Sequence, residues 1–338
     1  MRWTADQAWQ WHDAHQTPCG FNYVPRTAVN SLEMWQADWD PQTIAQELGW
    51  AQDLGMNACR VYLPFLLWQH DAPGLTHRLN QFLDMAAERG LSALLVLFDD
   101  CDSVGRDPVL GPQGEPVPGV HNSRWTPSPG HREAEDRTLW PALEAYVTEM
   151  VHRWGQDERV LAWDIYNEPG QSGMGVRSLP LLHDAFRWAR AAQPSQPPTA
   201  AIYSGPPPSV GNSEQAGDTP DADLSPDAAL SAAMLAESDI ASFHDYSDLP
   251  HLENQIAALQ ALGRPLLCTE WLCRPQSSLA ETHLPVLLRE RVGSYFWGLV
   301  NGRTQTQFPW GSPRTPPSRR SGSMTCCAAT APPMLPQK

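Results

Sequence analysis

The stretch Ala93-Leu-Leu-Val-Leu-Phe98 decides the fold class, because it is apolar on both faces. A strand without a polar face must be covered on both sides, as the strands of parallel sheets are. Working outward from this stretch, seven further short apolar runs are found along the chain. We therefore predict eight strands, at residues 21–24, 58–63, 93–98, 162–166, 200–203, 240–244, 266–269 and 294–299.

Segments with helical periodicity lie between these strands. Residues 41–54 carry Ile44, Leu48 and Ala51 on one face, and Asp40 is the predicted N-cap. Strands that alternate with helices indicate either a (β/α)8 barrel or a doubly wound parallel sheet. Further helices are predicted at residues 75–89, 137–154, 179–192, 228–236, 252–262 and 279–291.

Two glutamates stand at the ends of two predicted strands. Glu168 ends the run that begins at Leu161, and Glu270 ends the run that begins at Pro265. Barrel enzymes build their active sites where the C-terminal ends of the strands meet. A glutamate on the fourth of eight strands and another on the seventh favours the barrel. We predict a single-domain α/β protein, a (β/α)8 barrel over residues 1–311. Two carboxylates on one face are the minimal equipment for cleaving a glycosidic bond.

The composition excludes some partners. The chain of 338 residues has a net charge of −15 at pH 7, which argues against nucleic acid and against anionic membranes. Fifteen tryptophans are many for this length, and most are expected to pack in the core. Some fall in or beside the predicted loops at the strand ends, where indole faces could stack on sugar rings. These are Trp35, Trp39, Trp68, Trp125, Trp271, Trp297 and Trp310.

The seven cysteines form no CxxC pair, so the sequence predicts neither a disulfide framework nor a zinc site. Residues 1–7 contain no apolar segment of the kind that signal peptides carry. No stretch reaches the ~18 apolar residues of a membrane span. We therefore expect a cytoplasmic protein.

Two long loops and an unusual C-terminal segment stand out. The loops, residues 101–131 and 205–226, follow the third and fifth predicted strands and so emerge on the face where barrel active sites are built. Residues 312–338 contain six prolines, four basic residues and no acidic residue. No amphipathic helix is visible there to cover the eighth strand. We predict that this tail is disordered.

Taken together, these motifs resemble the retaining (β/α)8 glycoside hydrolases of the cellulase–mannanase type, which form glycoside hydrolase family 5 within clan A. The resemblance runs from about Gly20 to Gly311, and it is closest to members described as cellulase-like or xylanase-like. It implies that Glu168, in Asn167-Glu168-Pro169, is the acid/base and that Glu270 is the nucleophile. It also implies that Asn167 binds the sugar 2-hydroxyl group.

Four further residues are assigned by the same resemblance. Arg60 looks like the residue of strand two that orients the nucleophile, although a structural ion pair would also explain it. His244 and Tyr246 look like the pair that follows strand six, and Trp297 looks like the platform under the reacting sugar. For His244, a role in packing is an equal alternative. The implied mechanism needs no metal and no organic cofactor.

The chemistry sets conditions on the two glutamates. Glu168 must be protonated in one step and ionised in the next, which requires a raised pKa that depends on its surroundings. Glu270 must stay ionised, and a guanidinium and a phenol would stabilise its carboxylate. A separation of about 5–5.5 Å between the two carboxyl groups would imply retention of configuration.

The sequence departs from the family pattern after strand three. Many members carry a histidine there, whereas this chain has Asp99 and Asp100. Either aspartate could bind a sugar hydroxyl group or pair with Arg60. In the first loop, Trp35 is placed near the same mouth and is a candidate substrate contact.

Two rival functions stay open. One is a carbohydrate-binding barrel that has lost catalysis. The other is a metal-dependent hydrolase, which would need a His-x-His pair or a comparable ligand cluster at the strand ends. Transglycosylation is open as well, because a sugar could intercept the same intermediate as water. The kind of sugar, endo or exo action and the oligomeric state are not predicted.

Overall fold

A computed structural model describes residues 1–205 and 225–310. Within them, eight parallel strands form one sheet in the order β5-β4-β3-β2-β1-β8-β7-β6. An isolated parallel bridge pairs Ile202, three residues after the end of β5, with Phe243 of β6, so the sheet nearly closes on itself. The predicted (β/α)8 barrel is confirmed. The strands are β1 (Cys19–Asn22), β2 (Ala58–Tyr62), β3 (Ser92–Asp99), β4 (Val160–Asn167), β5 (Pro198–Thr199), β6 (Ala241–His244), β7 (Leu266–Trp271) and β8 (Gly293–Trp297).

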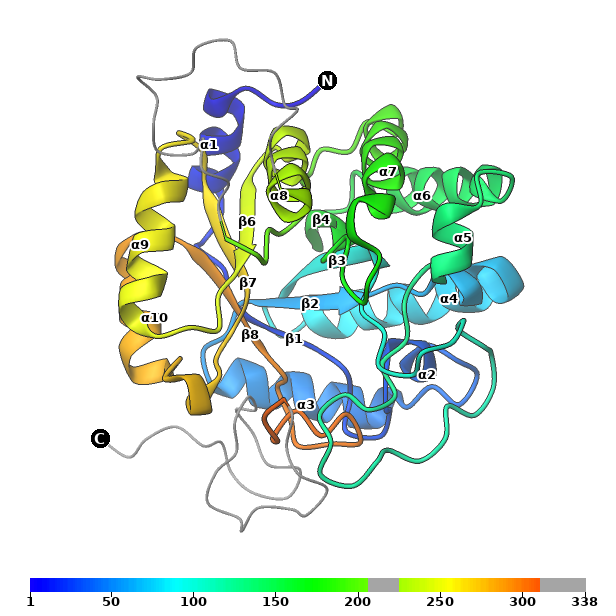
Figure 1. The fold of residues 1–338 in the computed structure, drawn as a ribbon. Coiled ribbons are helices and arrows are strands. Elements are labelled where there is room, and N and C mark those ends of the chain that lie inside the picture. The colour runs from blue at the N-terminus through cyan, green and yellow to red at the C-terminus, as the bar shows by residue number, and fades with distance from the viewer. Residues whose placement is uncertain (206–224, 311–338) are drawn as a thin grey trace.

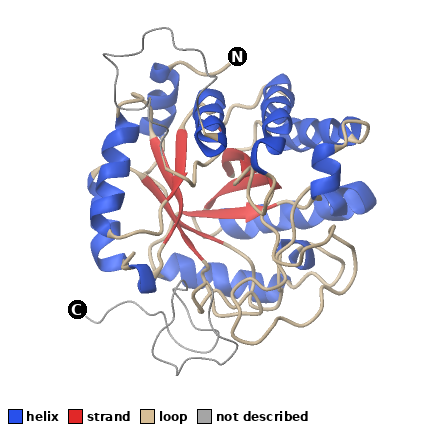
Figure 2. Ribbon diagram, in the orientation of Figure 1, coloured by secondary structure: helices blue, strands red, loops and turns tan. Residues whose placement is uncertain are grey.

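Helices surround these strands (Figures 1 and 2). The longer helices are α1 (Ala5–Ala14), α3 (Pro41–Asp53), α4 (Phe65–Ala87), α6 (Trp140–Trp154), α7 (Leu179–Ala191), α8 (Pro226–Glu237), α9 (Leu249–Gln260) and α10 (Ala280–Arg289). Four short segments complete the described set: α2 (Ser31–Met34), α5 (His131–Glu135) and the 3-10 turns η1 (Gly175–Ser178) and η3 (Arg274–Gln276). None of the helices in the described residues is both long and apolar enough to cross a membrane.

Most predicted boundaries hold within a few residues, with two exceptions. The fifth strand is predicted at residues 200–203, but β5 covers Pro198–Thr199 and only Ile202 of the predicted segment forms a bridge. The other exception is α4. It starts at Phe65, ten residues before the predicted start, and it contains a kink where Asp71 leaves helical geometry. Asp71 accepts a hydrogen bond from the amide of Gly74 at 3.0 Å, which caps the second half of the helix. That second half is the segment that the periodicity predicts. Asp40 caps α3 as expected, through the amide of Thr43 at 3.0 Å.

Helix α1 has no counterpart among the predicted helices. Thr4 and Gln7 form a capping box at its start, and this pattern can be recognised in the sequence. Trp11 and Ala8 of α1 pack on the lowest layer of residues inside the barrel. That layer consists of Ala58, Leu94, Leu161, Ala162, Ile240, Leu267 and Tyr295.

The barrel interior is narrow in this layer, where Gly20 lies close to the backbone of β2. A Cβ atom on Gly20 would lie 2.4 Å from the carbonyl oxygen of Ala58, so only glycine fits. Above it, the interior becomes polar, with Asn22 on β1, Arg60 on β2 and Asp164 on β4 all buried. This polar layer leads up to the C-terminal ends of the strands.

Two predictions cannot be compared with the structure. The predicted disordered tail at residues 312–338 lies outside the described residues, as do residues 206–224 of the loop after β5. The domain boundary at residue 311 stays a prediction.

Candidate active site at the C-terminal ends of the strands

The barrel brings the two glutamates together. Glu168 follows β4 directly, and Glu270 lies near the end of β7. One oxygen of each carboxylate and one ring nitrogen of His244 all lie within 4.8 Å of one another. His244 Nδ1 is 2.7 Å from Glu168 Oε1 and 3.7 Å from Glu270 Oε2. Residues that are 102 positions apart in the chain thus share one small site.

Arg60 lies beneath this site and connects its polar residues through hydrogen bonds. Its guanidinium is fully buried and donates to Glu270 Oε1 at 2.8 Å. It also donates twice to Asp164 Oδ2, at 3.0 and 2.7 Å. Two further hydrogen bonds reach Asn22 Oδ1 at 2.8 Å and Asn167 Oδ1 at 2.7 Å. A buried guanidinium with two carboxylate partners is well paired, and it fixes the position of both.

Two phenols complete the surroundings of Glu270. Tyr62 donates to Oε1 at 2.9 Å, and Tyr246 donates to Oε2 at 2.7 Å. Burial raises the pKa of each phenol well above its usual value, so both remain neutral donors. With Arg60, these donors hold both oxygens of the Glu270 carboxylate in place.

Glu168 has a different set of neighbours. His244 contacts Oε1, whereas the thiol of Cys101 lies 3.2 Å from Oε2 and Gln171 donates to Oε2 at 3.2 Å. Burial acts to raise the pKa of Glu168, but these hydrogen bonds and the charge of His244 outweigh it, and the pKa lies below its usual value. The expectation of a raised pKa is therefore not met in the structure without a bound sugar.

The backbone at Glu168 is also unusual. Its φ angle is +43°, in the left-handed region that residues with a side chain seldom adopt. Such strain persists where surrounding structure enforces it, and it often accompanies function. Glu168 does not cap a helix, because turns and not a helix follow it up to Met174.

Asn167 is held by the residues that follow β3. Its amide donates to Asp99 Oδ1 at 2.8 Å, and Asp99 Oδ2 accepts from the indole of Trp125 at 2.7 Å. Burial raises the pKa of Asp99 to about 7 against the opposing effect of these donors. Asp99 therefore positions Asn167 from below and does not line the cavity.

Asp100 and Trp35 do not reach the site. Asp100 is fully buried and accepts hydrogen bonds from the phenol of Tyr166 at 2.6 Å and the amide of Gly170 at 2.7 Å. It thereby ties down the turn after Glu168. Trp35 is fully buried, stacks on Trp39 and donates to the carbonyl of Tyr62 at 2.7 Å. Its expected contact with substrate is wrong, and it packs in the core.

Pairing of Asp99 or Asp100 with Arg60 is likewise not seen, because Asp164 occupies that role. Asp164 could have been found from the sequence. It lies in a strand with no exposed face, and a charge buried there must have a partner. Arg60, on a strand of the same kind, is the obvious one.

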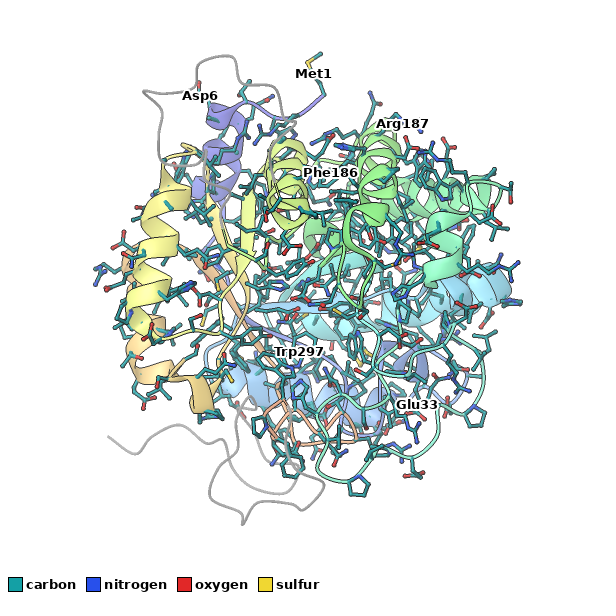
Figure 3. All side chains as sticks on the ribbon, in the orientation of Figure 1. Met1, Asp6, Glu33, Phe186, Arg187 and Trp297 are labelled. Atoms are coloured by element: carbon teal, nitrogen blue, oxygen red, sulfur yellow. The ribbon has the colours of Figure 1, made fainter. Side chains whose placement is uncertain are left out.

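The site opens into a cavity of about 710 Å³. Trp297, at the end of β8 and labelled in Figure 3, forms part of its wall together with Trp125. These two indoles pack edge-to-face at 5.5 Å, and each also packs on Tyr62. Among the predicted residues, the cavity is lined by Asn167, Glu168, His244, Tyr246, Glu270 and Trp297.

Cys101, like Tyr62 and Gln171, contacts the glutamates but is not among the predicted site residues. It lies two residues beyond β3, where its thiol contacts Glu168 and accepts from the amide of Asn167 at 3.6 Å. Burial raises the pKa of this thiol well above its usual value, so it is a donor and not a thiolate. The sequence does hold an indication of this position, because Cys101 closely follows a strand end in Asp99-Asp100-Cys101.

Glu168, His244 and Glu270 could together hold a metal ion, since the spacing of their ligand atoms permits it. The hydrogen bonds around them argue against this use. Glu270 already accepts from Arg60, Tyr62 and Tyr246, and the cation of Arg60 lies 2.8 Å from it. A divalent cation would have to compete with that charge.

Solved structures with the same fold have been found. An exo-β-1,4-mannosidase from Opitutaceae bacterium strain TAV5 matches with a TM-score of 0.57 and 17% identity, over 87% of this chain and 53% of its own. The endo-1,4-β-D-mannanase from Thermotoga petrophila RKU-1 matches with a TM-score of 0.57 and 12% identity, over 92% and 95%. A glycoside hydrolase family 5 mannosidase from Rhizomucor miehei matches with a TM-score of 0.55 and 13% identity, over 92% and 89%.

The chain has the fold of family 5 glycoside hydrolases. It spans about half the length of the Opitutaceae enzyme, at 53% of that chain. At these identities the likeness concerns the fold alone. No protein-family model matches the sequence, and no curated protein matches it.

Proposed function

We propose that this protein is a glycoside hydrolase that cleaves β-linked glycans with retention of configuration. The observation that carries the proposal is the pair Glu168 and Glu270, which share one cavity with oxygens within 4.8 Å but have opposite surroundings. Glu270 is held by a guanidinium and two phenols, as a nucleophile requires. Glu168 instead contacts His244, the thiol of Cys101 and Gln171, and it lines the cavity, where an acid/base can reach the departing oxygen.

The proposed reaction has two steps. In the first, a Glu270 oxygen forms a bond to the anomeric carbon while the glycosidic bond breaks, and Glu168 gives its proton to the departing oxygen. In the second, Glu168 takes a proton from water, which attacks the same carbon and releases Glu270. Asn167 would hold the 2-hydroxyl group and Trp297 would lie under the reacting ring.

The low pKa of Glu168 bears on the first step. Burial is the largest influence on this carboxyl group and acts to raise its pKa. A sugar that fills the cavity removes further water, so binding shifts Glu168 towards the protonated form that the first step needs.

The proposal is tested with 2-deoxy-2-fluoro glycosides that carry a good leaving group. They form the covalent intermediate but hydrolyse it slowly, so Glu270 should be labelled and the peptide around it should gain the mass of one fluoro-sugar. Aryl β-glucoside, mannoside, xyloside and galactoside would identify the sugar. A folded protein that neither turns over nor becomes labelled by any of these sugars would contradict the proposal.

A metal-dependent hydrolase is the second candidate, because Glu168, His244 and Glu270 form a ligand cluster of suitable spacing. The two candidates respond differently to chelators. Hydrolysis that survives EDTA and is unchanged by added Zn²⁺ or Mn²⁺ supports the retaining mechanism. Hydrolysis that EDTA abolishes and a metal restores supports the second candidate.

The thiol of Cys101 should influence the pH dependence of hydrolysis. In Cys101→Ala, Glu168 loses a donor that stabilises its anion, so its pKa rises and it stays protonated to higher pH. We expect the alkaline limb of the plot of kcat/KM against pH to move to higher pH. Cys101→Ser keeps a donor and should retain the limb near its original position. Identical limbs in wild type and Cys101→Ala would show that the thiol has no such influence.

A further inference from the structure

The cavity continues past the residues assigned to the reacting sugar. Beyond Tyr246 and Trp297, its wall includes Trp310, which follows β8, and His121 and Asn122, which belong to the loop after β3. The volume of about 710 Å³ lies within the range of sites that hold more than a single small group. These three residues have no part in the proposed chemistry.

Trp310 differs from the other indoles of the cavity in its exposure. It is 45% exposed, whereas Trp125 is 3% and Trp297 is 8% exposed. The ring is nevertheless supported, because it packs edge-to-face on Tyr246 with centroids 4.5 Å apart and against His121 at 5.5 Å. An aromatic ring that is half exposed at a cavity wall and held by neighbouring rings is suited to stack on an apolar sugar face.

His121 supplies polar chemistry beside this ring. Its Nδ1 lies 2.9 Å from the carbonyl oxygen of Phe308, which can only accept, so Nδ1 carries the hydrogen. Burial lowers the pKa of His121 to about 4, so the ring is neutral and Nε2 is an acceptor. Within the described residues, neither this nitrogen nor the buried Oδ1 of Asn122 has a partner. Unpaired buried acceptors are costly, and sugar hydroxyl groups could satisfy them.

The position of Trp310 relative to the two glutamates indicates which sugar it would meet. Tyr246, on which Trp310 packs, donates to Glu270. The groups around Glu168 Oε2 are instead Cys101 and Gln171. The strand that Trp310 follows, β8, is four places from β4 in the eight-stranded barrel, so it lies across the barrel from Glu168. Because the acid/base protonates the leaving group, Trp310 lies away from that group, beside the sugar that stays bound to the nucleophile.

We propose that Trp310, His121 and Asn122 form a second sugar-binding subsite, which holds the ring attached to the reacting sugar on its non-leaving side. The proposal rests on the proposed function and deepens it. It specifies the substrate as a β-linked oligosaccharide with at least two sugar rings before the cleaved bond. A single sugar with an aromatic leaving group would leave this subsite empty.

The test compares substrates that share a leaving group. We would measure kcat and KM for 4-nitrophenyl β-glucoside against β-cellobioside, and for β-mannoside against β-mannobioside. Wild type should prefer the disaccharide of the sugar that it accepts. Trp310→Ala should lower kcat/KM for that disaccharide about two- to tenfold, mainly through KM, and leave the monosaccharide unchanged. His121→Phe, which keeps a ring but removes the acceptor, should weaken the same preference.

Leu288→Ala, at an apolar residue of α10 that is 47% exposed, is the matched control and should change neither substrate. An equal loss on both substrates would mean that Trp310 acts through Tyr246, and this would overturn the subsite. The subsite would also be overturned if Trp310→Ala kept the preference of wild type for the disaccharide. If wild type hydrolyses none of the four, and the xyloside, the galactoside and the fluoro-sugars give neither turnover nor labelling, the proposed function fails by itself. In that case calorimetry measures the binding of cellobiose and mannobiose to wild type and to Trp310→Ala. Weaker binding to the variant supports the subsite, and equal binding rejects it.

Discussion

Glu270→Ala is expected to abolish hydrolysis of aryl β-glycosides, with a loss of at least about 10⁴-fold in kcat. The substitution removes the atom that bonds to the anomeric carbon, and no described neighbour is a substitute nucleophile in that position. The space left by the carboxylate admits a small anion. Azide should therefore restore turnover and give a glycosyl azide of inverted configuration, which proton NMR identifies from the anomeric coupling.

Glu168→Ala provides the matched comparison. Azide that replaces this side chain attacks the intermediate on Glu270, so its product should keep the configuration of the substrate. The two variants thus give opposite anomers, and the anomer identifies the role of each glutamate. Retained product from Glu270→Ala, or inverted product from Glu168→Ala, would show that the roles are exchanged or that the mechanism is different.

Arg60→Met is expected to lower the free energy of unfolding by about 3–5 kcal/mol and to remove most of the hydrolytic activity. Methionine fills much of the volume but leaves Asp164 and Glu270 buried without their cation. Two unpaired carboxylates in one small layer destabilise the barrel, and Glu270 is no longer held in place. Urea unfolding gives the stability, and kcat/KM on the best aryl glycoside gives the activity.

The control is Arg153→Met, because Arg153 pairs with Glu149 on the exposed surface of α6. That change should cost less than about 1 kcal/mol and leave activity unaltered. Arg60→Lys serves if the methionine variant does not fold. It keeps the charge but not the planar fork that reaches Asp164, Glu270 and Asn167 together. Equal losses of stability at positions 60 and 153 would contradict the conclusion that Arg60 holds Asp164 and Glu270 in place.

The sequence was sufficient to predict the barrel, because strands that are apolar on both faces leave few architectures available. It was also sufficient to place Glu168, Glu270, Arg60 and Tyr246 at one mouth, since residues at parallel strand ends must converge. These four residues lie on a strand or within two residues of its end, so their positions depend less on loop geometry than those of residues farther along the loops.

The errors arose where loop geometry determines the position. Trp35 was assigned to the mouth because it follows the first strand, yet the short helix α2 directs its ring into the core. Asp99 and Asp100 are neighbours in the chain, but one supports Asn167 and the other the turn at Gly170. Neither outcome can be derived from the order of residues, because each depends on how the end of β4 and the turn after it pack against Asp99 and Asp100.

The seam between β5 and β6 has a consequence for heat sensitivity. Strand β5 has only two residues. The sheet is closed towards β6 by the bridge at Ile202. In that bridge the carbonyl of Ile202 accepts a hydrogen bond from the amide of His244 at 2.8 Å. Local opening follows the line with the fewest hydrogen bonds. Because His244 contacts Glu168, warming would disturb the acid/base before the molecule loses its global structure. Catalysis should therefore decline at temperatures where circular dichroism still reports an intact barrel.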